Sequence, residues 1–222
     1  MFFHWLEKNP FFFASAISLV IAFAGLIEIV PNFAKAARPV VDLKPRTVLE
    51  LAGKKVYVKD NCMACHSQMI RPFKSETDRY GDYSLSGEYA YDRPFLWGSK
   101  RTGPDLHRIG NYRTTDWHEN HMLNPAEIVP GSIMPAYEHQ FTNLADIETA
   151  YAEAVTVKNA FHTPYGPEFK RTRAAWEAHR PKVLADAKAI ADDMKNKDVK
   201  EAVANGQVPE IVALIAYLNS LK

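Results

Sequence analysis

Cysteine is nearly absent from this sequence, which holds only two cysteines in 222 residues. Two thiols cannot build a framework of several disulfides, and they fill at most half of a four-cysteine zinc site. Neither sign of charge is in excess, because 27 Lys and Arg side chains oppose 26 Asp and Glu, for a formal net charge of +1. No basic run is interleaved with aromatics, so we expect no nucleic acid partner. Long alternations of apolar and polar residues are also lacking, which predicts a mainly α fold.

A long apolar run is present near the N-terminus. Residues 11–30 carry a single charged side chain, Glu28. At about 1.5 Å per residue, a helix of this length spans roughly 30 Å, the thickness of the hydrocarbon core of a bilayer. Small residues at 34–37 would suit a signal peptidase, but the run exceeds the apolar part of a signal peptide, about 7–15 residues. We therefore predict a retained transmembrane anchor over residues 1–34. Glu28 fits an interfacial carboxylate at headgroup depth better than a contact with another membrane subunit.

The rest of the chain is predicted to consist of helices separated by irregular segments. After a linker at about 31–44, a helix should begin near Pro45, since proline suits the first helical turn, and should run to the first cysteine. The segment 208–222 predicts an amphipathic helix with apolar residues at i, i+3, i+4 and i+7. These residues are Ile211, Leu214, Ile215 and Leu218. We also expect helices at 114–123, from Asn143 to Lys158, and as two charged stretches split around Pro181, with irregular chain at 67–101 and 124–137.

Both cysteines belong to one motif, in which Cys62 and Cys65 are three residues apart and His66 follows directly. Zinc would need two further ligands, for which His118 and His121 are the candidates. A redox dithiol would need a βαβ context that the sequence lacks. The C-x-x-C-H form is that of covalent haem attachment, because two thiols on one turn reach the two vinyl groups and the next imidazole lies beneath the iron. We favour one covalently bound haem c, with the zinc and dithiol interpretations left as alternatives.

The iron of such a haem needs a second axial ligand opposite His66. Met134 is the preferred candidate, because Gly131 and Pro135 would hold it in a loop with its thioether projecting. Met122 is the main rival, on the short helix that also carries the two histidines proposed for zinc, and a histidine ligand is the other alternative. The remaining internal methionines lie too close to the motif or in a charged helical stretch, where a gap-filling role is expected: Met63, Met69 and Met194.

A Met/His pair would leave no open position on the iron and raise its reduction potential, which predicts electron transfer and no substrate binding. A haem enzyme or gas sensor would need an open or labile sixth position. The other histidines have simpler interpretations. His118 and His121 are expected at the surface or against a haem propionate, and His107 near the propionates or in solvent.

These features together resemble the class I cytochromes c. In that family, positions matching Gly53 and Tyr57 before the haem motif pack against positions matching Leu214 and Tyr217 on the last helix. The loop GPDL at 103–106 matches the one whose proline carbonyl, here that of Pro104, accepts a hydrogen bond from the proximal histidine. The loop MPAY at 134–137 matches the sixth-ligand loop.

Longer strings sharpen the resemblance to the mono-haem subunit of cbb3-type cytochrome c oxidases, CcoO or FixO. They are CMACHSQMIRPF, YDRPFLWGSKRTGPDLHRIG and DWHENHMLNPAEIVPGSIMPAY, together with the anchor. The implied fold is mainly α: a single N-terminal transmembrane helix over 1–34, then a class I cytochrome c domain over 35–222 with long insertions at about 67–101 and 140–207. The sequence gives no purpose for the second insertion.

The resemblance implies a non-catalytic electron-transfer subunit of a terminal oxidase in aerobic or microaerobic respiration. Electrons would come from a di-haem cytochrome c subunit or a soluble cytochrome c, pass through this haem, and reach haem b of the catalytic haem-copper subunit, where oxygen is reduced. The loop 95–101 is the candidate for docking on that subunit. An independent membrane-anchored cytochrome c shuttle is the alternative function.

The implied location is the bacterial inner membrane, single-pass, with the N-terminus cytoplasmic and the haem domain periplasmic. The charge distribution points the other way: Lys8 precedes the apolar run, and four basic residues follow it, which by the positive-inside rule favours a cytoplasmic C-terminus. Haem attachment to C-x-x-C-H occurs outside the bacterial cytoplasm, so we expect the haem requirement to prevail. The four residues are Lys35, Arg38, Lys44 and Arg46.

Overall fold

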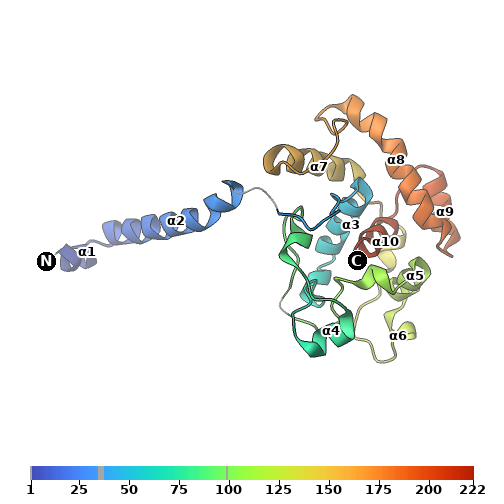
Figure 1. The fold of residues 1–222 in the computed structure, drawn as a ribbon, viewed down its shortest axis with the longest axis horizontal. Coiled ribbons are helices and arrows are strands. Elements are labelled where there is room, and N and C mark those ends of the chain that lie inside the picture. The colour runs from blue at the N-terminus through green and yellow to red at the C-terminus, as the bar shows by residue number, and fades with distance from the viewer. Residues whose placement is uncertain (1, 35–37, 99) are drawn as a thin grey trace. The chain divides into compact units, whose positions relative to one another are not determined.

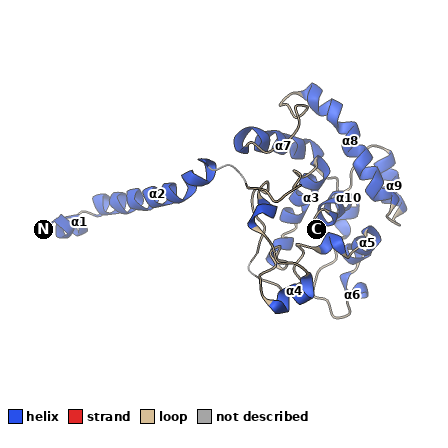
Figure 2. Cartoon of the chain, viewed as in Figure 1, coloured by secondary structure: helices blue, strands red, loops and turns tan. Residues whose placement is uncertain are grey.

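The computed structural model describes residues 2–34, 38–98 and 100–222. The chain divides into two compact units, Met1–Arg38 and Pro39–Lys222. Within the described residues the structure is helical, with one isolated antiparallel bridge between Leu144 and Pro209 and no strand (Figure 2). The mainly α prediction is therefore confirmed.

The first unit consists of α1 (Phe2–Lys8) and α2 (Pro10–Ala34). The segment Pro10–Val30 is long and apolar enough to cross a membrane, with a mean hydropathy of 2.3. The helix runs past Pro31, so the linker begins later than predicted. A proline so close to the helix end removes only one backbone hydrogen bond. Of the small residues considered as a cleavage site, those at 35–37 lie outside the described residues.

The second unit is built around α3 (Val48–Lys59) and α10 (Glu210–Asn219), which make the most extensive helix pair in the unit (Figure 1). Helix α3 begins three residues later than predicted from Pro45. Thr47 and Glu50 form a reciprocal capping box there, which satisfies two backbone N–H groups that a start at Pro45 would leave to solvent.

The two helices approach closely because Gly53 has no side chain. A Cβ built on Gly53 would lie 1.9 Å from the carbonyl oxygen of Ala213 and 2.8 Å from Cβ of Tyr217. The rings of Tyr57 and Tyr217 are neighbours at 5.5 Å, and Leu214 is fully buried. This is the packing that the class I cytochrome c resemblance implied.

Helix α10 is not amphipathic in the folded protein. Every side chain from Ile211 to Leu218 is buried. The predicted polar face does not exist because α5 (Thr115–Leu123) and α8 (Arg173–Asp192) also pack against α10, in addition to α3. The apolar side therefore extends around the whole helix, as expected of an element in the middle of a core.

The predicted second insertion forms α7 (Ile147–Phe161), α8 and α9 (Lys197–Ala204). The predicted break of α8 at Pro181 is wrong, since the helix continues through it. Pro181 and Glu177 are both exposed, so water can satisfy the Glu177 carbonyl that the proline ring leaves unbonded. Within this layer, Tyr151 stacks on Phe169 and contacts Trp176, with centroid distances of 5.4 and 5.3 Å.

Two segments predicted as irregular contain short helices. The segment 67–101 holds α4 (Lys74–Tyr80) and a 3-10 turn at Ser86–Tyr89, and the segment 124–137 begins with α6 (Pro125–Ile128). The prediction of a helix at 114–123 is confirmed by α5. Three further 3-10 turns complete the unit, at Cys62–Ala64, Ile109–Asn111 and Glu138–Phe141.

Candidate functional site

The two cysteines sit on a tight turn directly after α3. Asn61 adopts a left-handed conformation with φ 57°, which ends the helix and starts the 3-10 turn Cys62–Ala64. The amide N–H groups of Cys65 and His66 both donate to the carbonyl of Cys62, at 3.2 and 2.9 Å. A single turn of backbone therefore fixes the two thiols and the imidazole relative to one another.

The burial of one thiol argues against a redox dithiol. Cys62 is buried and Cys65 is exposed, and neither forms a disulfide. Burial, with the nearby Asp60 carboxylate, raises the pKa of the Cys62 thiol to about 12. Redox-active cysteines in C-x-x-C motifs instead have lowered pKa values that make the thiolate available.

His66 is held as a neutral imidazole with one nitrogen committed. Its Nδ1 lies 2.8 Å from the carbonyl oxygen of Pro104, which can only accept, so Nδ1 carries the proton and Nε2 keeps a free lone pair. Burial lowers the pKa of His66, which favours this neutral form. A Cβ at Gly103 would lie 2.2 Å from Cε1 of the ring, so glycine is required where the two segments meet. Such a nitrogen is a ready metal ligand.

A buried carboxylate that the sequence analysis missed ties these segments together. Asp105, directly after Pro104, accepts hydrogen bonds from the Ser67 hydroxyl at 2.6 Å and from the amides of Met69 and His107 at 2.9 and 2.8 Å. Two backbone bonds, from Gly103 to the Cys65 carbonyl and from Leu106 to the Ser67 carbonyl, run parallel to them. A burial pattern, which only the fold provides, would have been needed to single out Asp105.

A cavity of about 590 Å³ opens beside this turn. Its lining brings together Cys62, Cys65, His66, Pro104 and Met134, which lie far apart in the sequence. The volume is within the range of small-molecule and cofactor sites, about 300–1,000 Å³. Met122, the rival candidate for the iron ligand, lines the cavity too. Met194, for which we expect a gap-filling role, is buried in the core at 2% exposure.

Met134 projects from a loop as predicted. Gly131 has φ 79° and open space around it, and the Ser132 hydroxyl accepts a hydrogen bond from the Met134 amide at 3.2 Å. Met122 instead lies on the buried face of α5, where its carbonyl accepts from the Tyr137 amide at 2.8 Å. The loop position gives Met134 more freedom to adjust to an iron than the helix gives Met122.

The charge of the lining suits an anionic macrocycle. Two cations, Arg79 and Arg113, line the cavity, and no Asp or Glu is among its described lining residues. Apolar and aromatic side chains make up most of the remainder, including Leu106, Ile109 and Leu218. A haem is a flat apolar ring with two carboxylates, so the residues present fit it.

Burial bears on the predictions for three histidines. His118 is 1% exposed and lines the cavity, so its predicted surface position is wrong. Helix α5 packs its face against α10, which takes the side chain out of water. His121 lines the cavity as well and is half-buried. His107 is buried and does not line the cavity, because it packs on Tyr89 and contacts Glu88 at 2.8 Å instead of facing solvent.

The zinc alternative finds no support in the geometry. Among the described residues, the one group with three potential ligand atoms within 4.8 Å of one another is Asp60, His139 and Glu210, and it contains neither cysteine. There the Lys59 ammonium already binds both carboxylate oxygens of Glu210, at 2.5 and 2.6 Å.

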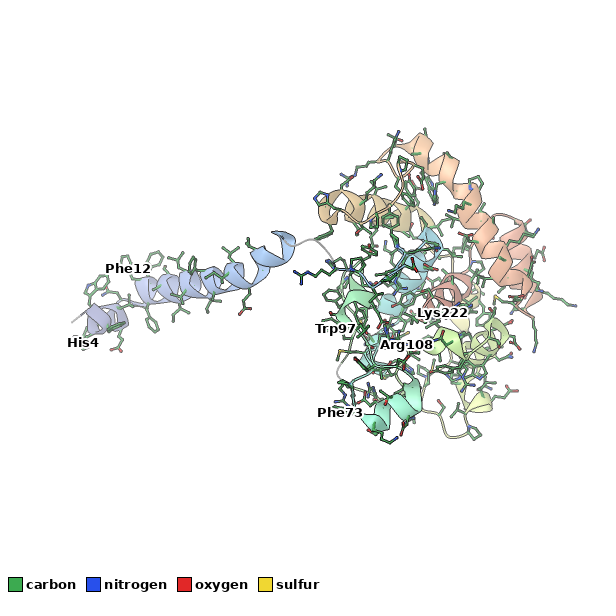
Figure 3. The ribbon with its side chains drawn as sticks, viewed as in Figure 1. His4, Phe12, Phe73, Trp97, Arg108 and Lys222 are labelled. Atoms are coloured by element: carbon green, nitrogen blue, oxygen red, sulfur yellow. The ribbon has the colours of Figure 1, made fainter. Side chains whose placement is uncertain are left out.

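The predicted docking loop exposes two stacked aromatic rings. Phe95 and Trp97, the latter labelled in Figure 3, have centroids 4.8 Å apart and planes inclined by 4°, with 40% and 39% of each residue exposed. The Trp97 carbonyl accepts from the Gln68 amide at 2.8 Å, which joins the loop to the segment after the cysteine motif. Ser99 of this loop lies outside the described residues.

Comparison with known proteins gives one family. Residues 3–222 match the family described as cytochrome c oxidase, mono-heme subunit/FixO. The search of curated proteins found no match. The matched range includes the apolar helix, the cysteine turn, the cavity and the helices of the second insertion. The chain belongs to the FixO family of mono-haem cytochrome c oxidase subunits.

Proposed function

We propose that the chain relays electrons within a cbb3-type oxidase through a single low-spin haem c. Cys62 and Cys65 form the thioethers, and His66 and Met134 are the axial ligands. The observation that carries the proposal is the free Nε2 of His66, which lines the same cavity as Met134 while Nδ1 is fixed on Pro104. The bound haem supplies an iron that gains and loses one electron.

The chain's own residues keep that iron in an electron-transfer role. With both His66 and Met134 holding the iron, no coordination position would be left for a substrate. The Pro104 carbonyl orients the imidazole and increases its basicity, and Met134 raises the reduction potential. Apolar lining from Leu106 and Leu218 limits the water around the site, which reduces reorganisation when the charge changes.

The proposed route runs from a di-haem cytochrome c subunit or a soluble cytochrome c to this haem, and on to haem b of the catalytic haem-copper subunit. The stacked Phe95 and Trp97 form the contact with the catalytic subunit in this proposal. Exposed aromatic pairs of this kind are enriched at protein interfaces. Purification in mild detergent separates this function from that of an independent shuttle. A subunit comes out with haem b and copper-bearing partners, whereas a shuttle comes out alone.

We further propose that α2 anchors the protein in the bacterial inner membrane, with the N-terminus in the cytoplasm and residues 39–222 in the periplasm. This orientation opposes the charge bias around α2 and rests on where haem is attached to C-x-x-C-H. Reporter enzymes fused after Lys222 test this orientation. A reporter that works only in the periplasm is expected to be active. Activity of a reporter that works only in the cytoplasm would refute both the orientation and the haem.

A further inference from the structure

Helix α5 presents an unsatisfied imidazole to the cavity. His118 is 1% exposed, and neither of its ring nitrogens has a hydrogen-bond partner. A buried polar group left without a partner is costly and therefore rare in folded proteins, so it calls for an explanation such as a water, ion or ligand at that place. His121, on the same face, has an unpartnered Nδ1, but it is only half-buried and water can reach part of the ring.

The surroundings of His118 are electropositive. The Arg113 guanidinium lies 4.4 Å from the Trp117 ring centroid, and Trp117 in turn stacks on His121 at 4.6 Å and meets His118 edge-on at 5.4 Å. Burial, followed by the proximity of His121 and Arg113, lowers the pKa of His118 to about 4. His118 is therefore neutral near pH 7, with one N–H to donate, and it stands beside a cation with no carboxylate among the described lining residues.

The chemistry of the proposed cofactor leaves one kind of partner for that N–H. Apart from the iron, the polar atoms of a haem are its two carboxylates, and the rest of the ring is apolar. In the proposed function the iron is taken by His66 and Met134. A buried donor facing the cavity is then satisfied by a carboxylate, and a nearby guanidinium balances the negative charge.

We propose that His118 donates a hydrogen bond to one propionate of the haem, with Arg113 as the counter-charge. The inference rests on the proposed function, because it requires the haem in this cavity. It assigns a role to a helix face that the covalent and axial attachments do not explain. The bond draws negative charge away from the iron's surroundings, and so favours the reduced state.

The test compares variants of the purified, haem-bearing protein. His118→Leu removes both nitrogens, and Arg113→Gln removes the cation at an exposed position where folding is not at risk. Leu123→Ala is the control, because it changes the same helix at an exposed position that does not line the cavity. Haem staining on a denaturing gel, the potential of haem c and the propionate bending band in resonance Raman spectra are measured on each.

We expect haem staining to be unchanged in all three variants. The potential should fall and the propionate band should shift in His118→Leu and, to a smaller degree, in Arg113→Gln, with neither change in Leu123→Ala. Unchanged potential and band in His118→Leu, or an equal fall in Leu123→Ala, would overturn the inference and leave the proposed function standing. Loss of the low-spin spectrum in His118→Leu would mean that His118 ligates the iron, and would overturn both the inference and the assignment of Met134 as the ligand. Absence of covalent haem from the unaltered protein would refute the proposed function and this inference together.

Discussion

Replacing Gly53 by alanine tests the close contact between α3 and α10 in the second unit. Alanine would help an isolated helix by about 1 kcal/mol relative to glycine. In this protein the new Cβ would lie 1.9 Å from the Ala213 carbonyl oxygen, whereas real Cβ atoms essentially never approach within 3.0 Å. The helices would have to separate by at least 1.1 Å, the difference between 3.0 and 1.9.

That separation is costly because the new Cβ would meet backbone atoms of α10, and α10 cannot move away from α3. Helix α10 is buried on all sides and is held by α5 and α8 as well as by α3. Overpacking a core costs about 1–3 kcal/mol and sometimes more. We take an overpacking cost of about 3 kcal/mol, the upper end of this range, and subtract the helix-propensity gain of about 1 kcal/mol. The net loss of folding stability is then about 2 kcal/mol. For a unit of this size that loss lowers the melting temperature by about 4–8 °C.

Thermal melting of the haem-bearing chain in detergent, followed by circular dichroism, measures the change. Ala189→Gly at an exposed position of α8 is the control, because it isolates the propensity contribution and should cost about 1 kcal/mol. A Gly53→Ala protein as stable as the unaltered chain, or more stable, would show that the helices do not approach as closely as described.

Three further changes give distinct expectations. Cys65→Ala should reduce or abolish covalent haem staining on a denaturing gel, since one of the two tethers is gone. Asp105→Asn removes the charge from a buried acceptor of three short hydrogen bonds and should cost about 1.5–3 kcal/mol in urea unfolding, with undiminished stability as the refuting result. Burial alone would raise the pKa of Glu88, but hydrogen bonds from Arg108, the Leu85 amide and His107 lower it to about 2. Its stabilisation is therefore present above pH 4.5 and lost as the pH falls towards 2, and Glu88→Gln should flatten the fall in urea midpoint over that window.

Local sequence patterns predicted the positions of two helices well. The last helix followed from its apolar spacing, and the apolar run at 11–30 followed from its length and composition. The prediction of a helix break at Pro181 was wrong because the cost of a proline inside a helix depends on whether the carbonyl four residues earlier can reach water. That exposure is a property of the fold.

The candidate site also contains residues that local patterns predict and residues whose role depends on the fold. The positions of Cys62, Cys65 and His66 on one turn follow from their spacing, and Pro104 came from a resemblance. Asp105 and the buried state of His118 could not be foreseen, because each depends on which segments pack together far along the chain.

The three helices between residues 147 and 204 have a structural effect that the sequence did not reveal. Val155 of α7, Val183 and Ala187 of α8 and Val199 of α9 are all buried in the same apolar core as α10. Through α8, which packs against α10, the insertion covers a face of α10 that the amphipathic pattern had predicted to be exposed to solvent.

A spectroelectrochemical titration of the unaltered protein and of Met134→Leu tests the central claim most directly. We predict one low-spin haem c whose oxidised form shows the charge-transfer band of a sulfur-ligated iron. In Met134→Leu the haem should stay covalently attached, the band should disappear and the potential should fall markedly. An unchanged band and potential in Met134→Leu would contradict the ligand assignment on which the electron-relay function rests.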